Sequence, residues 1–134
     1  MAKILFVCVG NAYRSIIAEA YARKYLKGFE IKSAGIRPFG YVPDEVIQVL
    51  EEDGVDTSGL YSKPVNTSEI SEYDYVVVLS RIFFFAPTKV LYYDVEDPAF
   101  SSIDFLRKVR DQIKQIVIEL SENLERNKGM QVSD

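Results

Sequence analysis

One short segment decides the fold of this chain: Cys8-Val9-Gly10-Asn11-Ala12-Tyr13-Arg14-Ser15. It follows a continuous apolar run at residues 4–7 and precedes a helical pattern that starts near Ile16. We therefore expect a strand that ends at Cys8 and a helix that begins at Arg14, with a short loop between them. The N–H groups of such a loop and of the helix N-terminus can surround an anion. This segment, which we call the cradle, predicts an oxyanion site with a thiol at its base and a guanidinium at its rim.

The composition is that of a globular protein. With 134 residues, of which 48% are apolar and 27% charged, we expect a single domain over residues 1–134 with its own hydrophobic core. The net charge is −4 and no basic stripe stands out, so nucleic acid is not an expected partner. No apolar run approaches the roughly 20 residues that span a membrane. We expect a monomer that binds neither nucleic acid nor membrane.

The residue inventory narrows the chemistry and the compartment. Cys8 is the only cysteine, which excludes an intramolecular disulfide and fits a reducing cytosol. The first residues lead directly into a strand without the features of a signal peptide, so a cytoplasmic location is expected. The sequence contains no histidine, which excludes Ser-His-Asp and Cys-His catalysis and argues against a zinc site. We expect no metal ion and no organic cofactor.

Strand patterns alternate with helical patterns along the chain. Short apolar runs predict strands at residues 3–7, 29–33, 75–79 and 89–95. Helices are predicted from Arg14 to before Gly28, from Pro43 to before Gly54, and from Ser102 past Leu124, with a short turn after residues 67–69. Residues 34–42 should form an ordered loop, residues 80–87 a loop or short helix, and residues 130–134 a frayed tail. This order predicts an α/β fold with an open parallel sheet and helices on both faces.

The same order brings distant residues together. Ligands of open parallel sheets bind outside the carboxyl ends of the strands. Cys8 ends the first strand, and Asp97 lies just past the fourth. We therefore expect Cys8 and Asp97 at one edge of the sheet.

Cys8 and Arg14 suit a phosphoryl-transfer site. A cysteine at a helix N-terminus beside a cation favours the nucleophilic thiolate. Arg14 offers a planar fork that can bind two phosphoryl oxygens at once. Cys8 could instead be a small buried side chain that ends a strand. A cation in the first turn of a helix is electrostatically unfavourable, however, so the position of Arg14 supports a functional role.

The pattern of a cysteine, five residues, an arginine and a serine resembles the phosphate-binding loop of cysteine-dependent phosphatases. With the strand before it, the segment resembles the low-molecular-weight protein tyrosine phosphatase family. Further matching segments are Ala18-Glu19-Ala20, Ser33-Ala34-Gly35 and Gly54-Val55-Asp56-Thr57-Ser58-Gly59. The resemblance implies four parallel strands in the order 2-1-3-4. The same scaffold also resembles arsenate reductases.

The resemblance also implies roles for residues of this sequence. Cys8 would be the nucleophile, Arg14 the phosphoryl clamp, and Asp97 of the Asp97-Pro98 pair the general acid, with Asp94 and Glu96 as weaker alternatives. Asn11 would hold the loop through a bond toward Ser33, or be an ordinary turn residue. The substrate would contact Val9, Gly10, Asn11, Ala12, Tyr13, Ser15 and Phe39. Ser15 would support the thiolate, or simply cap the helix. Phe39 would be an aromatic wall, although Phe39 and Phe100 could instead pack under loops.

This sequence departs from the family pattern at several positions. Tyr13 stands where many relatives carry a second cysteine, so an oxidised Cys8 would lack an internal partner. Ser80 replaces a common aspartate, and Ala99 replaces an aromatic residue. Ile16 replaces a proline, and Leu60 and Lys63 replace a histidine and an arginine. Because Ala99 carries no aromatic ring, we expect the slot that holds a substrate's aromatic ring to be incomplete.

The function expected from these features is hydrolysis of phosphotyrosine proteins or small aryl phosphates through a cysteinyl-phosphate, with inorganic phosphate as product. One alternative is a single-cysteine arsenate reductase that uses an external thiol. A second alternative is a phosphate-binding module without catalysis.

Overall fold

The computed structural model describes residues 1–133, with side chains described up to Glu125. The strands are β1 (Ala2–Cys8), β2 (Phe29–Gly35), β3 (Tyr75–Val78) and β4 (Lys89–Tyr92). The helices are α1 (Arg14–Tyr25), α2 (Asp44–Glu52), the 3-10 helix η1 (Ile70–Glu72) and α3 (Ile103–Ser133). In this part of the chain, no helix has both the length and the apolar character needed to cross a membrane.

The four strands form one parallel sheet in the order β2-β1-β3-β4, which confirms the predicted α/β class and strand order. Cys8 pairs with Gly35, so the carboxyl ends of β1 and β2 coincide. The central strands are buried on both faces, which explains their continuous apolar sequence.

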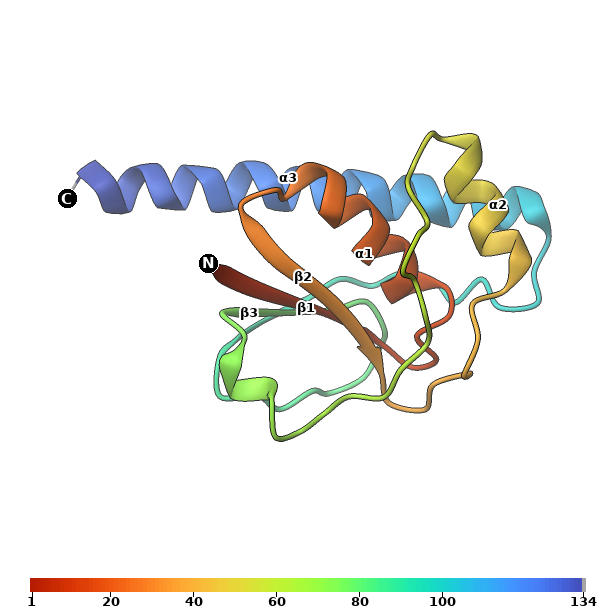
Figure 1. The fold of residues 1–134 in the computed structure, drawn as a ribbon, viewed down its shortest axis with the longest axis horizontal. Helices are drawn as coiled ribbons and strands as arrows, with labels where there is room; N and C mark the ends of the chain where they lie inside the picture. The colour runs from red at the N-terminus through yellow and green to blue at the C-terminus, as the bar shows by residue number, and fades with distance from the viewer. Residues whose placement is uncertain (134) are drawn as a thin grey trace.

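Alternate residues of β1 enter two different cores. Ile4 and Phe6 belong to the main core, which lies under α1, α2 and α3. Leu5 and Val7 belong to a smaller core that is covered by η1 and irregular segments. Figure 1 shows the three α-helices together on one side of the sheet and η1 on the other. Helices were predicted on both faces of the sheet. The face opposite the α-helices carries only the single 3-10 turn η1.

Several observed bounds differ from the expected ones. β2 continues to Gly35, into the segment expected to form a loop, and β3 ends at Val78 rather than at residue 79. β4 ends at Tyr92 rather than at residue 95, and beyond its end the side chain of Asp94 binds Arg81. Residues 80–87 form no helix, so of the two predicted alternatives the loop is the one observed. Helix α3 continues to Ser133, where a frayed tail was expected from residue 130, and Asp134 lies outside the described residues.

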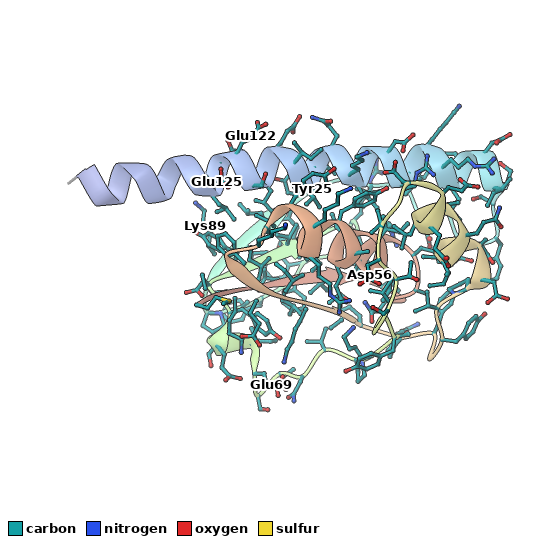
Figure 2. All side chains as sticks on the ribbon, turned by 45° about the horizontal axis from the view of Figure 1, so that its top comes forward. Tyr25, Asp56, Glu69, Lys89, Glu122 and Glu125 are labelled. Atoms are coloured by element: carbon teal, nitrogen blue, oxygen red, sulfur yellow. The ribbon has the colours of Figure 1, made fainter. Side chains whose placement is uncertain are left out.

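The surface carries charged side chains on both sides of this layered body. Figure 2 shows Glu69 and Glu122 at opposite sides of the molecule, Glu69 near η1 and Glu122 on α3. The site predicted from the sequence lies at a third place, the edge of the sheet where the strands end.

Candidate active site

The cradle turns sharply at Asn11, where φ is 45°. Asparagine tolerates this left-handed conformation better than most residues. The carbonyl oxygens of Cys8, Val9 and Gly10 accept hydrogen bonds from the N–H groups of residues 36, 37 and 39. Within residues 1–133, the N–H groups of Gly10, Ala12 and Tyr13 have no acceptor, whereas that of Asn11 points to Cys8 Sγ at 3.3 Å. The loop thus keeps its donors for a ligand, as an anion site requires.

The thiol of Cys8 lies inside a buried polar cluster. Its Sγ is 2.9 Å from Ser15 Oγ. Asn11 Nδ2 donates to Ser15 Oγ at 2.8 Å and to Ser33 Oγ at 3.0 Å. Asn11, Ser15 and Ser33 are all nearly inaccessible to solvent. A hydroxyl so close to sulfur can donate to a thiolate.

Arg14 is held in place by carbonyl groups of the segments that follow β3 and β4. Its Nη1 donates to the carbonyl oxygens of Val95 at 3.0 Å and Leu79 at 3.4 Å. Its Nε is buried and has no partner. Arg14 as a whole is only 6% exposed, so it is sequestered at the sheet edge. Because Nε has no partner, the guanidinium still has an N–H group that can bind an oxyanion.

Asp97 faces the same guanidinium. Its Oδ2 is 3.7 Å from Arg14 Nη2, and its Oδ1 accepts from the N–H of Ala99 at 3.0 Å. The carboxyl is more than half exposed. One small cavity of about 40 Å³ is lined by Cys8, Val9, Gly10, Tyr13, Arg14, Phe39 and Asp97. The structure thus places the thiol, the guanidinium and the carboxyl around one space, although Cys8 and Asp97 are far apart in sequence.

Aromatic rings border this cavity. Phe39 stacks on Phe100 with ring centroids 6.3 Å apart and contacts Tyr13 edge-to-face at 6.1 Å. Phe100 has a φ of 61° and is 86% exposed, so it does not pack under a loop. Ala99, the residue directly after the Asp97-Pro98 pair, packs against the main core instead. Phe100, and not Ala99, is thus the residue that places a side chain beside Phe39.

The two weaker candidates for the acid lie outside this cavity. Asp94 binds the Arg81 guanidinium through both oxygens, at 2.8 and 2.7 Å. That partner lowers the pKa of Asp94. Asp94 and Glu96 line a neighbouring hollow, which Arg14 and Asp97 also line. Of the three acidic residues, only Asp97 borders the cavity that contains Cys8.

Sequence reasoning missed the residues that support the cradle from behind. Glu19 is 2% exposed, and its carboxylate accepts from Ser33, Lys63 and Arg23. The backbone N–H of Lys63 donates to Asn11 Oδ1 at 2.8 Å. A single glutamate in a run of alanines was the available signal, because it lies in the buried part of α1.

Tyr13 has a second partner that the sequence did not indicate. Its hydroxyl donates to Glu45 Oε1 at 2.9 Å, which ties the cradle to the first turn of α2. Burial and the bond to this carboxylate raise the pKa of Tyr13 to about 12. The phenol therefore stays neutral at physiological pH and remains a donor to Glu45.

Comparison with known proteins places the chain in a family. Residues 3–84 match the family described as low molecular weight phosphotyrosine protein phosphatase. The chain belongs to this family, as the sequence resemblance predicted.

The similar proteins include both arsenate reductases and phosphatases. A glutaredoxin arsenate reductase from Synechocystis is 33% identical, over 90% of this chain and 96% of its own length. The YwlE arginine phosphatase from Geobacillus stearothermophilus superposes with a TM-score of 0.84 at 27% identity, covering 96% of each chain. The tyrosine phosphatase Wzb from Escherichia coli K30, solved with sulphate, gives a TM-score of 0.81 at 25% identity, covering 91% of this chain and 97% of its own.

Proposed function

We propose that this protein is a cysteine-dependent phosphatase that hydrolyses phosphotyrosine or other aryl phosphate monoesters. The observation that carries the proposal is the convergence of Cys8, Arg14 and Asp97 on one cavity at the carboxyl end of β1. A thiolate, an oxyanion clamp and a carboxyl group are the groups that hydrolysis through a covalent intermediate requires.

In the first step, Cys8 Sγ attacks phosphorus from the base of the cradle. A sulfur–phosphorus bond forms while the bond from phosphorus to the phenolic oxygen breaks. Asp97 gives its proton to the departing oxygen, so a neutral phenol leaves. Arg14 and the free N–H groups of the cradle hold the other three oxygens, whose charge changes as the reaction proceeds.

In the second step, water replaces the sulfur. Asp97, now ionised, takes a proton from a water molecule whose oxygen attacks phosphorus. The sulfur–phosphorus bond breaks, inorganic phosphate leaves, and Cys8 returns to the thiolate. Ser15 Oγ, at 2.9 Å from the sulfur, supports that leaving group by donating a hydrogen bond.

The rings at the mouth support an aryl substrate. Phe39 and Phe100 lie within 6.3 Å of one another and are inclined by only 20°, so they form a continuous apolar wall beside the cradle. A flat aromatic leaving group can stack against such a wall, which adds attraction beyond the buried area. This wall favours phosphotyrosine or small aryl phosphates over alkyl phosphates.

Arsenate reduction is the second candidate, and the Synechocystis relative favours it. Cys8 would attack arsenic and displace water, forming a sulfur–arsenic bond. Because the chain has one cysteine, an external thiol would have to attack the Cys8 sulfur. That attack gives a mixed disulfide, and the two electrons of the sulfur–arsenic bond reduce arsenate to arsenite. A phosphate-binding module without catalysis would need neither Cys8 nor Asp97.

The three functions separate in one set of assays. Wild type and Cys8→Ser are given p-nitrophenyl phosphate, and separately arsenate with and without a glutaredoxin system. Hydrolysis that is lost in Cys8→Ser supports the phosphatase, and arsenite formed only with the thiol system supports the reductase. Phosphate binding without either turnover would support the module and overturn the proposal. Phosphoarginine is included as a substrate, because the Geobacillus relative is an arginine phosphatase.

A further inference from the structure

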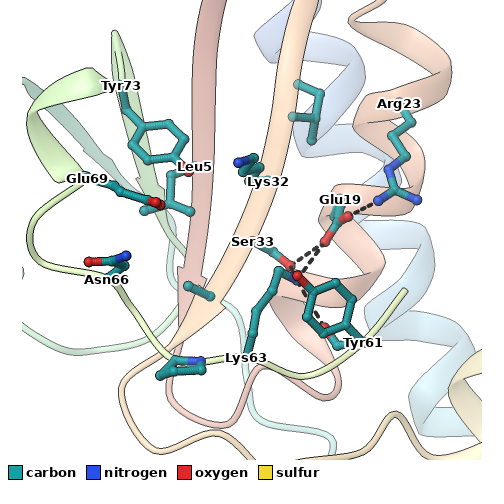
Figure 3. A pocket seen from close by; sticks show the side chains of 13 residues that line it. Leu5, Glu19, Arg23, Lys32, Ser33, Tyr61, Lys63, Asn66, Glu69 and Tyr73 are labelled. Atoms are coloured by element: carbon teal, nitrogen blue, oxygen red, sulfur yellow. Dashed lines mark hydrogen bonds and ion pairs between the residues drawn. The ribbon is translucent and has the colours of Figure 1, made fainter. Parts of the chain in front are cut away.

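Another pocket lies behind the cradle, along the outer edge of β2. It has a volume of about 470 Å³. Figure 3 shows Glu19, Ser33 and Lys63 joined by hydrogen bonds and ion pairs on one side of it, with Glu69 and Tyr73 across from them. None of the steps proposed above uses this pocket.

Lys63 is the centre of the bonded cluster. Its Nζ donates to Glu19 Oε1 at 3.3 Å, to Ser33 Oγ at 3.1 Å and to the carbonyl oxygen of Tyr61 at 3.0 Å. The three protons of an ammonium group are thereby all used. Burial lowers the pKa of Lys63, the Glu19 carboxylate opposes that effect, and the cations Arg23 and Lys32 add to it.

These bonds fix the direction of the Ser33 hydroxyl. Ser33 donates its one proton to Glu19 Oε1. Its oxygen then has two lone pairs, which accept from Lys63 Nζ and from Asn11 Nδ2. Ser33 is thus a fully satisfied acceptor toward the cradle.

The amide of Asn11 links Ser33 to Ser15, and its orientation is also fixed by hydrogen bonds. A backbone N–H can only donate, so the bond from Lys63 N places the Asn11 oxygen toward Lys63. The NH₂ group must then face both Ser33 and Ser15. Ser15 accepts from Asn11, and this leaves the Ser15 proton free to point at Cys8 Sγ, 2.9 Å away.

We infer that Lys63 is a positioning residue for Cys8, acting through Glu19, Ser33 and Asn11 to aim the Ser15 proton at the sulfur. The inference deepens the proposed function and rests on it only in taking Cys8 as the nucleophile. Lys63, which lines this pocket, would thus affect catalysis without contacting the substrate.

Loss of the Lys63 ammonium would leave Glu19 buried beside one cation fewer. Arg23 would still bind the Glu19 carboxylate, but Ser33 Oγ would lose one of its two donors. The Ser33 hydroxyl could then turn away from Asn11, whose amide would no longer be held on that side. The Ser15 proton would lose its fixed direction, and the thiolate of Cys8 would lose a hydrogen bond.

The test measures the rate at which iodoacetamide alkylates Cys8 as a function of pH. This readout reports the thiolate and needs no turnover, so it stays informative if the phosphatase assay fails. Lys63→Met is compared with Lys63→Arg, which keeps the charge, and with Lys32→Met, which removes a cation from the same pocket. Lys63→Gln replaces Lys63→Met if the methionine variant does not fold.

We expect Lys63→Met to move the midpoint of the profile upward by about half a pH unit or more, which lowers alkylation below the midpoint about threefold. Lys63→Arg should stay near wild type, and so should Lys32→Met. Ser33→Ala should give a similar upward shift, and Lys63→Met should add nothing further to it, because both act through one path. A wild-type profile for Lys63→Met, an equal shift for Lys32→Met, or additive shifts in the double variant would overturn the inference.

Discussion

Replacing Gly35 by alanine tests whether the backbone of the cradle must lie where the structure places it. Gly35 ends β2 beside the cradle. A Cβ at this position would lie 2.8 Å from Val9 O, 2.8 Å from Asn11 Cβ and 2.9 Å from Asn11 N. Ordinary contacts of a Cβ begin at 3.4 Å, so the alanine would have to push the cradle away by about half an ångström.

Gly35 cannot move away to make room. Its N–H donates to Lys63 O at 2.9 Å and its carbonyl accepts from Val65 N at 3.0 Å. On the other side it pairs with Cys8 in the sheet. Two of the three obstacles are backbone atoms, so the strain must be taken up by the cradle itself. Overpacking of this kind destabilises proteins by roughly 1–3 kcal/mol.

The assay is urea unfolding together with steady-state hydrolysis of p-nitrophenyl phosphate. We expect Gly35→Ala to lose roughly 1–3 kcal/mol of unfolding free energy. We expect its kcat to fall by about tenfold to a hundredfold, because a misplacement near 1 Å can cost about a hundredfold. Gly10→Ala is the matched control, since the three atoms nearest to its Cβ would all belong to the ring of Phe39, the first at 2.7 Å.

The control should behave differently because a side chain yields more easily than backbone. Gly10→Ala should raise KM through displacement of Phe39 and change kcat less than Gly35→Ala does. If Gly35→Ala kept the kcat and stability of the wild type, the close packing of the cradle against β2 would have no bearing on catalysis, and the reasoning would fail.

Other perturbations test other parts of the structure. Asp97→Ala should slow hydrolysis of phenyl phosphate by roughly 10²–10⁴-fold and that of p-nitrophenyl phosphate much less, since the better leaving group needs less protonation; equal losses would rule out a general acid. Phe100→Ala should raise KM for aryl phosphates and leave KM for an alkyl phosphate unchanged, as measured with matched esters. Glu52, which binds Arg107 at 2.7 Å, has a pKa lowered to about 2. A lowered pKa contributes stability above the ordinary value of 4.5 that is lost as pH falls toward 2, so Glu52→Gln should weaken this acid dependence in urea titrations.

The sheet and the cradle were predictable because local and long-range signals agree there. The run before Cys8 is apolar at every position, as a strand buried on both faces must be. The turn residues that follow, and the helix that starts at Arg14, then fix where the strand ends. Alternation of strands and helices was enough to bring Asp97 to the same edge as Cys8.

The placement of the helices was harder to predict. The connection between β3 and β4 contains Ile82-Phe83-Phe84-Phe85, a run compatible with a helix or a loop. Only Phe84 of its three phenylalanines is buried, and the segment covers the smaller core without forming a helix. Periodicity cannot distinguish these outcomes in so short a segment.

The parts of the site that were missed depend on tertiary contacts. Phe100 adopts a left-handed conformation that an aromatic residue rarely takes on local grounds, so its stacking on Phe39 had no sequence signal. Helix α1 is buried continuously over its first nine residues, so its sequence has no amphipathic pattern. Without such a pattern, the sequence does not reveal that the charge at Glu19 is buried. The partner of Glu19, Lys63, lies in a loop 44 positions away.

The most direct test of the account is to look for phosphate on Cys8 during turnover. Wild type is mixed with p-nitrophenyl phosphate, quenched within its turnover time, digested, and the peptide that contains Cys8 is weighed by mass spectrometry. If Cys8 is the nucleophile, this peptide gains the mass of one phosphoryl group, Cys8→Ala gains none, and Asp97→Ala accumulates more of the adduct because its hydrolysis is slowed. Turnover without any phosphorylated Cys8, in wild type and in Asp97→Ala alike, would show that hydrolysis does not pass through a cysteinyl-phosphate.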